Sequence, residues 1–209
     1  MIKHIIFDFD GTIVDSLDLS FHIYNELANK FKYRPITREE MHVLKNAPLK
    51  ERFKKVGLPL YRIPKMTFEV MTMYNSGIKH LKAFDGINEL LDNLKNTGLN
   101  LSVLSSNSVN NITDFFENNN IVGFDNIISS NNIFGKHKTL KKFMKHNNLS
   151  SDEIIYVGDE LRDVEACKKL AIKVIAVLWG FDPKNLLETG NPDCFAAEPE
   201  DIYEFATSF

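Results

Sequence analysis

The stretch Phe7-Asp8-Phe9-Asp10-Gly11-Thr12-Ile13 decides the fold, because it places two carboxylates two residues apart directly after the apolar run Ile5-Ile6. Strand side chains alternate between the two faces of a sheet. At the carboxyl edge of a parallel sheet, however, the backbone turns away, and Gly11 supplies the freedom that lets both carboxylates point into one crevice. Two acids in one crevice indicate a divalent metal. Taken alone, the pair also fits a strand end that caps a helix.

Five short β-rich runs recur along the 209-residue chain. They cover residues 2–9, 99–105, 126–128, 153–157 and 172–178. Between most of them, apolar residues recur every three or four positions, as Ile87, Leu90, Leu91 and Leu94 do, which predicts amphipathic helices. Alternating strands and helices are typical of an α/β fold, here a Rossmann-like parallel sheet core with helices on both faces.

Residues 17–82 interrupt this alternation, because they contain several helical patterns and no convincing strand. The patterns predict helices at 17–31, 37–45, 49–56 and 64–76, and Thr37 with Glu40 has the spacing of a capping box. We therefore expect an inserted all-helical cap domain at residues 17–82. Residues 1–16 and 83–209 would form the α/β core.

The composition is that of a globular protein, with 44% hydrophobic and 25% charged residues. A net charge of −3 gives no reason to expect nucleic acid or an anionic membrane as a partner. Only Cys167 and Cys194 are present, which fits a reducing compartment better than a disulfide framework. No apolar run approaches the roughly 18 residues of a membrane span. The sequence thus predicts a cytoplasmic location, and nothing in it indicates an oligomeric state.

Polar groups also follow the second and third predicted strands, at the edge where an open α/β sheet binds its ligands. Ser105 and Ser106 come after the second strand, where their hydroxyls could bind phosphate oxygens or cap a helix. Lys136 and Lys138 lie at a later helix start, where a lysine opposes the helix dipole. This indicates a nearby anion, unless the lysine is simply solvated.

Two more acids follow the fourth predicted strand. Asp159 and Asp163 are spaced four apart, one helical turn, after the run that ends at Val157. Both could therefore face the same metal as Asp8, and oxygen ligands of this kind suit Mg²⁺.

These four segments, in this order, resemble the motifs of the haloacid dehalogenase superfamily of phosphohydrolases. Asp8-Phe9-Asp10-Gly11-Thr12 matches its D-x-D-G-T motif, Ser106 its strand-end serine or threonine, Lys136 its lysine, and the segment from Gly158 to Asp163 its G-D-x-x-x-D motif. The resemblance covers essentially the whole chain. The helical insert is similar to the cap of the phosphoglycolate phosphatase and β-phosphoglucomutase branch, with Phe84-Asp85-Gly86 as the return to the core.

The resemblance implies a phosphatase that acts on a small phosphorylated metabolite, phosphoglycolate-like or a sugar phosphate, through an aspartyl-phosphate. Asp8 would be the nucleophile, and Asp10 the general acid and base. Asp8, the backbone carbonyl of Asp10, and Asp159 would hold Mg²⁺ as the cofactor. Asp163 would bind the metal through water or orient Lys136.

The resemblance also implies which groups bind the transferred phosphoryl group. Ser106, the backbone N–H of Asn107 and Lys136 would grip its oxygens, and Thr12 is expected among the substrate-binding residues. Ser105 replaces Ser106 if the strand ends one residue earlier. Lys138 is likewise the alternative to Lys136.

The cap should read the rest of the substrate. The best candidate for this contact is the break between the predicted second and third helices at residues 44–52, which matches the position of this branch's specificity loop. Lys45, Lys50 and Arg52 could meet an anionic substrate tail there, or they could form a solvated helix face.

Several other activities stay open at this point. Mutase relatives usually place a histidine where this chain has Ser20, which favours a phosphatase over a phosphotransferase of the β-phosphoglucomutase type. A phosphonatase would need a Schiff-base lysine from the cap, for which Lys30 or Lys32 are candidates. A pyrophosphatase fits as well. A phospho-ligand sensor that kept the fold without turnover is the non-enzymatic alternative, although a sensor has no need of Asp10.

Overall fold

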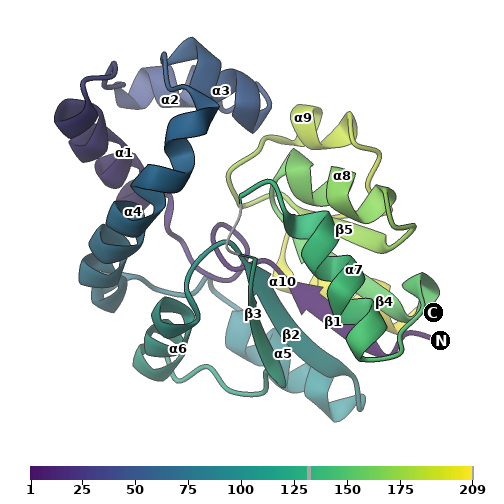
Figure 1. Ribbon diagram of the computed structural model, residues 1–209. Coiled ribbons are helices and arrows are strands. Elements are labelled where there is room, and N and C mark those ends of the chain that lie inside the picture. The colour runs from purple at the N-terminus through teal and green to yellow at the C-terminus, as the bar shows by residue number, and fades with distance from the viewer. Residues whose placement is uncertain (131–132, 209) are drawn as a thin grey trace.

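The computed structural model describes residues 1–130 and 133–208. Its centre is a parallel sheet of six strands in the order β3-β2-β1-β4-β5-β6 (Figure 1). The strands are β1 (His4–Phe7), β2 (Asn100–Ser105), β3 (Asn126–Ser129), β4 (Ile154–Gly158), β5 (Lys173–Val177) and β6 (Cys194–Ala196). Parallel pairing of β1 with both β2 and β4 brings three carboxyl-terminal strand ends together at the centre of one edge.

The α/β class with a parallel sheet is confirmed, but the prediction of five strands was incomplete. β6 pairs with β5 through Ile175 and Cys194, Ala176 and Phe195, and Val177 and Ala196. The strand has only three residues, too few for a hydrophobic period to stand out in the sequence. It forms because the β5 edge supplies the pairing, which is a tertiary contact.

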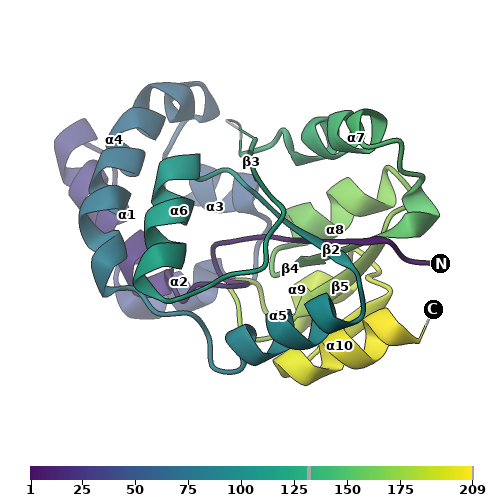
Figure 2. The ribbon, with the colours of Figure 1, turned by 90° about the horizontal axis from the view of Figure 1, so that it is seen from below.

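Helices cover both faces of the sheet, as the strand-helix alternation predicts. One face packs against α5 (Ile87–Asn96), α6 (Val109–Asn118) and α10 (Pro199–Thr207) through a core that includes Ile5, Phe7 and Val157. The other face packs against α7 (Lys136–His146), α8 (Leu161–Lys168) and α9 (Lys184–Glu188) through Ile6, Tyr156 and Val174 (Figure 2). Successive β1 residues therefore serve opposite cores, and the buried sheet holds the strand ends in fixed positions.

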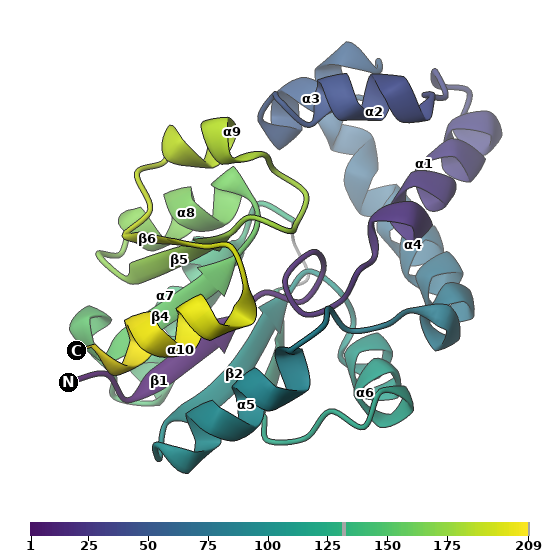
Figure 3. The same ribbon diagram turned by 180° about the vertical axis from the view of Figure 1, so that it is seen from behind.

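The segment from residue 17 to 82, here called the cap segment, is helical throughout its regular structure. Its helices are α1 (Leu17–Phe31), α2 (Arg38–Leu44), α3 (Leu49–Lys55) and α4 (Ile63–Gly77), with short 3₁₀ turns η1 (Leu60–Arg62) and η2 (Ile78–His80). The Thr37 and Glu40 capping box is confirmed at the start of α2. Figures 1 and 3 show these helices beyond the carboxyl ends of the strands, on the side where polar residues were expected.

The chain enters and leaves the cap segment at neighbouring positions. Val14 forms an isolated antiparallel bridge with Ala83. The Asp15 backbone N–H donates to the Lys82 carbonyl at 3.1 Å, and the Phe84 N–H donates to the Ile13 carbonyl at 3.0 Å. The two crossings are thereby fixed next to the loop that carries Asp8 and Asp10. Within the described residues, no helix is both long enough and apolar enough to cross a membrane.

Candidate active site

Asp8 lies at the carboxyl end of β1 and forms a buried ion pair with Lys136. The Lys136 ammonium donates to Asp8 Oδ2 at 2.7 Å and also to Asp163 Oδ1. All three side chains are at most 4% exposed. Lys136 is the first residue of α7, so its position at a helix start is explained by two carboxylates that outweigh the helix dipole. Lys138, the alternative, is exposed on the same helix.

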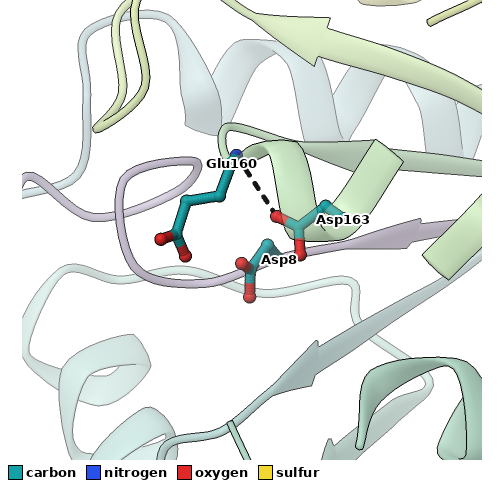
Figure 4. A group of neighbouring side chains, drawn as sticks. All are labelled: Asp8, Glu160 and Asp163. Carbon is teal, nitrogen blue, oxygen red and sulfur yellow. Dashed lines mark hydrogen bonds between the residues drawn. The ribbon is translucent and has the colours of Figure 1, made fainter. Parts of the chain in front are cut away.

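Three acids around this lysine form a cluster with the spacing of a metal site. Single ligand oxygens of Asp8, Glu160 and Asp163 lie within 4.8 Å of one another, and Figure 4 shows the three side chains converging. Glu160 directly follows Asp159 in the loop between β4 and α8, and it was not among the predicted ligands. Its carboxylate accepts a hydrogen bond from Arg162 Nε at 2.6 Å, which fixes its direction.

Asp159 is fully buried, and both of its oxygens accept hydrogen bonds. The Thr12 hydroxyl donates to Oδ1 at 3.1 Å, and the Phe181 backbone N–H donates to Oδ2 at 2.8 Å. A Cβ at Gly11, where φ is +78°, would lie 2.1 Å from Asp159 Oδ2, so glycine is required there. The Thr12 side chain, expected among the substrate-binding residues, donates to Asp159 and is fully buried.

The charges in this crevice do not balance. Among the described residues, the acids of the crevice form ion pairs with two cations: Lys136 pairs with Asp8 and Asp163, and Arg162 pairs with Glu160, whereas Asp159 has no ion pair and meets Lys45 only at longer range. Burial raises the pKa of Asp163, and burial followed by repulsion from Glu160 and Asp8 raises the pKa of Asp159 well above its usual value. Burial lowers the pKa of Lys136, but Asp163 and Asp8 outweigh that effect and raise it overall. An oxygen-rich crevice with excess negative charge is the donor set that Mg²⁺ prefers.

The two serines after β2 have different surroundings. Ser105 is buried, and its hydroxyl oxygen accepts the Asn107 backbone N–H at 3.0 Å. Ser106 is half-buried and lines a cavity, and no other described residue hydrogen-bonds its hydroxyl. The geometry therefore leaves the Ser106 hydroxyl available to a ligand. The Asn107 N–H, expected to bind phosphate, already has a partner in this arrangement.

Asp10 lies where the core meets the cap segment. Its Oδ1 accepts hydrogen bonds from the Ser16 hydroxyl at 2.8 Å and the Tyr74 hydroxyl at 2.6 Å. The Asn107 side-chain amide donates to Oδ2 at 3.3 Å. Burial raises the pKa of Asp10, although these hydrogen bonds act in the opposite direction. A carboxyl group with a raised pKa is suited to hold a proton and release it. Tyr74, on α4, was not predicted as a site residue.

A cavity of about 300 Å³ lies between the strand ends and the cap segment. From the core it is lined by Asp10, Ser106, Asn107, Glu160 and Arg162, and from the cap segment by Ser20, Lys45, Arg52 and Tyr74, among others. Most of its remaining lining is apolar and comes from α1 to α4. The cavity therefore connects the general region of the acids with the segment expected to read a substrate.

The three cations proposed for the cap segment have three different surroundings. The Lys45 side chain lines the cavity, and among the described residues it forms no ion pair. Arg52 also lines it, but its Nη2 forms an ion pair with the buried Asp182 and donates to the Lys45 carbonyl, while its Nε donates to the Ala47 carbonyl. Lys50 lies outside the cavity, with its ammonium 5.2 Å from the centre of the Phe134 ring.

Removing the lysine charge tests the electrostatic arrangement. In metal-free protein, Lys136→Met should lower the free energy of unfolding by about 3–5 kcal/mol, because Asp8 and Asp163 would be left buried and unpaired. Lys138→Met, an exposed position on the same helix, should change it by less than about 0.5 kcal/mol. Urea unfolding at pH 7 measures both. Equal losses in the two variants would mean that the buried ion pairs do not hold this site together.

Comparison with known proteins agrees with the geometry. The chain matches the haloacid dehalogenase-like hydrolase family over residues 5–177. It is 31% identical to a phosphoglycolate phosphatase from Synechococcus elongatus over 204 residues, which cover 97% of this chain and 96% of that protein. It is 23% identical to the pyrophosphatase PpaX of Bacillus velezensis, covering 95% of this chain and 93% of the relative.

The fold is also that of a solved structure described as a predicted phosphatase from Clostridium acetobutylicum. The two chains cover each other over 100% of their lengths, with a TM-score of 0.85 at 22% identity. Sequence and structure therefore agree on the resemblance that the motifs suggested. The chain belongs to the haloacid dehalogenase-like hydrolase family, and it is an enzyme of that family's capped phosphatase branch.

Proposed function

We propose that this protein is a Mg²⁺-dependent phosphatase that hydrolyses a small phosphate monoester through an aspartyl-phosphate on Asp8. The observation that carries the proposal is the Asp8, Lys136 and Asp163 arrangement, in which a nucleophile candidate, a buried cation and an acid cluster meet at the end of β1. A carboxylate that approaches a phosphate dianion is repelled, so positive charge has to be fixed in the crevice beforehand.

Each step has a residue to perform it. An oxygen of Asp8 attacks phosphorus, and the bond from phosphorus to the substrate's alcohol oxygen breaks while Asp10 gives that oxygen its proton. Asp10 then takes a proton from a water molecule that attacks the phosphoryl group, which releases phosphate and restores Asp8. Ser106 and Lys136 would bind the phosphoryl oxygens during both steps.

The proposed ligands of Mg²⁺ are Asp8, the backbone carbonyl of Asp10, Asp159 and Asp163. Glu160 joins them because its carboxylate, and not that of Asp159, belongs to the cluster of converging ligand atoms. When bound, Mg²⁺ supplies positive charge beside the phosphoryl group. The residues fit such an ion because four carboxylates exceed the two cations among them.

Phosphoglycolate is the first substrate to test, because the relative at 31% identity carries that name. Pyrophosphate is the second candidate, since relatives such as that of Bacillus velezensis are pyrophosphatases. A screen with Mg²⁺ would compare phosphate release from phosphoglycolate, sugar phosphates, pyrophosphate and nucleoside monophosphates. We expect a clear preference for a monoester. If phosphate were released fastest from pyrophosphate, the substrate would be assigned as pyrophosphate and not as a monoester. If no compound released phosphate, the proposed function would be contradicted.

A mutase is less well supported than a phosphatase by the cavity. Ser20, which stands where mutase relatives usually have a histidine, lines the cavity. A serine hydroxyl cannot take over the proton transfer of an imidazole near neutral pH. Transfer of the phosphoryl group to water is therefore the reaction that the cavity favours.

Lys45 is the proposed contact for an anionic substrate tail. Lys45→Ala should lower kcat/KM for phosphoglycolate by about 10- to 100-fold, the usual cost of a lost charged hydrogen bond, and leave acetyl phosphate almost unchanged. Lys50→Ala is the matched control, because Lys50 lies outside the cavity. Steady-state kinetics on both substrates measure the effect. If Lys45→Ala leaves both substrates unchanged, or slows both equally, selection must come from another part of the cap segment.

A further inference from the structure

We propose that Tyr74 on α4 is a positioning residue that holds Asp10 in the orientation needed for general-acid catalysis, so that the cap segment controls the acid directly. The inference rests on the proposed function. Tyr74 is only 4% exposed, and its hydroxyl donates to Asp10 Oδ1 at 2.6 Å, across the boundary between the cap segment and the core. Bulk water therefore cannot replace this contact.

The hydrogen bonds distinguish the two oxygens of Asp10. Oδ1 accepts from two hydroxyls, those of Tyr74 and Ser16, whereas Oδ2 accepts only a long contact from Asn107 at 3.3 Å. In a protonated carboxyl group, the carbonyl oxygen is the stronger acceptor, so the oxygen with the two short hydrogen bonds is the carbonyl oxygen and the one with the single long contact carries the proton. The geometry thus places the transferable proton of Asp10 on Oδ2.

A second set of contacts links the same helix to the other oxygen. The side-chain amide of Asn75, the residue after Tyr74, donates to Asn111 Oδ1 at 3.0 Å. Asn111 in turn donates to Asn107 Oδ1 at 2.9 Å, which turns the Asn107 amide nitrogen toward Asp10 Oδ2. Helix α4 therefore orients both oxygens of Asp10. It reaches Oδ1 directly through Tyr74, and it reaches Oδ2 through Asn75, Asn111 and Asn107.

This arrangement has a specific kinetic consequence. A general acid matters most when the leaving oxygen is strongly basic, and it matters little when the leaving group departs readily as an anion. If Tyr74 orients the acid, its hydroxyl should be needed for poor leaving groups and nearly dispensable for good ones. A tyrosine that only supported packing would affect both kinds of substrate to the same extent.

The test compares Tyr74→Phe with native protein on two esters of similar shape, phenyl phosphate and 4-nitrophenyl phosphate, in the presence of Mg²⁺. The readout is kcat/KM, which covers the steps up to departure of the alcohol and excludes hydrolysis of the aspartyl-phosphate. We expect kcat/KM for phenyl phosphate to fall about 10-fold more than kcat/KM for 4-nitrophenyl phosphate.

Two further variants complete the test. Ser16→Ala removes the other hydroxyl that donates to Oδ1, and it should show the same dependence on the leaving group. The Ser16 side chain makes no capping hydrogen bond to α1, so this substitution should leave the start of the helix intact. Tyr33→Phe removes a hydroxyl elsewhere in the cap segment, where it donates to Met66 Sδ, and should behave as native protein.

The positioning role would be overturned if Tyr74→Phe and Ser16→Ala each lowered kcat/KM equally for the two esters, or lowered it for neither. The phosphatase assignment would stand in both cases. If Tyr74→Phe does not fold, Asn75→Ala decides, because it breaks the second link from α4 to Asp10 and should show the same dependence on the leaving group. Native protein that hydrolyses neither ester would overturn the proposed function, and the positioning role with it.

Discussion

Asp8→Asn is expected to reduce phosphatase turnover roughly 10⁴-fold or more, the largest effect of any single substitution in the site. An amide is a far poorer nucleophile than a carboxylate. The substitution also removes the charge that pairs with Lys136 at 2.7 Å, and it takes one of the three converging oxygens away from the proposed metal site. Nucleophile, ion-pair partner and metal ligand are thus lost together.

Release of inorganic phosphate from the preferred ester measures this effect, and thermal unfolding checks that the variant is folded. Asp92→Asn, an isosteric change of an exposed aspartate on α5, is the matched control and should keep native activity. Folded Asp8→Asn protein that retains more than roughly a few per cent of native turnover would assign the nucleophile to another residue.

Asp10→Asn is expected to slow turnover on the order of 10²–10⁴-fold, because the amide can neither give a proton to the leaving oxygen nor accept one from water. Mg²⁺ affinity should be nearly native, since the ligand proposed at this position is the backbone carbonyl. The amide oxygen can still accept from the Ser16 and Tyr74 hydroxyls, and only the long contact from Asn107 is lost, so the local structure should persist.

The rate and the metal affinity have to be measured on the same preparation, the first by phosphate release and the second by calorimetric titration with Mg²⁺. Asp10→Asn should change the rate alone. A parallel collapse of Mg²⁺ affinity would make the Asp10 side chain a metal ligand, and the assignment of acid and base would have to move to another group.

Much of the fold could be predicted from the sequence because its signals are local. Strands β1, β4 and β5 are continuous apolar runs, which is what burial on both faces requires, and α1 has the predicted bounds of residues 17–31. β6 could not be predicted, because its three residues depend on the edge of β5. The division into a core and a cap domain at residues 16 and 83 stays a prediction.

Some residues of the candidate site also have a local sequence signal, and others do not. Asp8, Asp163 and Lys136 were identified because each follows a strand or begins a helix at one edge of the sheet, and the structure brings them together. Glu160 was missed because a glutamate beside Asp159 has no spacing signal of its own, although its place directly after a strand end could have suggested it.

Contacts between the cap segment and the rest of the chain could not be predicted from the sequence. Tyr74 lies 64 positions from the Asp10 that it contacts, and Arg52 lies 130 positions from Asp182. Neither pair has a local pattern, since each depends on how the helices of the cap segment pack against the strand ends. Arg52 therefore suggested a substrate ligand, whereas in the structure its side chain is engaged with Asp182 and two backbone carbonyls.

The central claim is that Asp8 itself becomes phosphorylated, and mass analysis of acid-quenched protein tests it most directly. Asp10→Asn protein would be mixed with Mg²⁺ and 4-nitrophenyl phosphate, quenched within the first turnover, digested, and searched for a phosphoryl group. Slow hydrolysis in this variant should let the intermediate accumulate. We predict one phosphoryl group, on the peptide that contains Asp8, and none in the Asp8→Asn protein. Release of phosphate by native protein with the phosphoryl group on another residue would contradict this account.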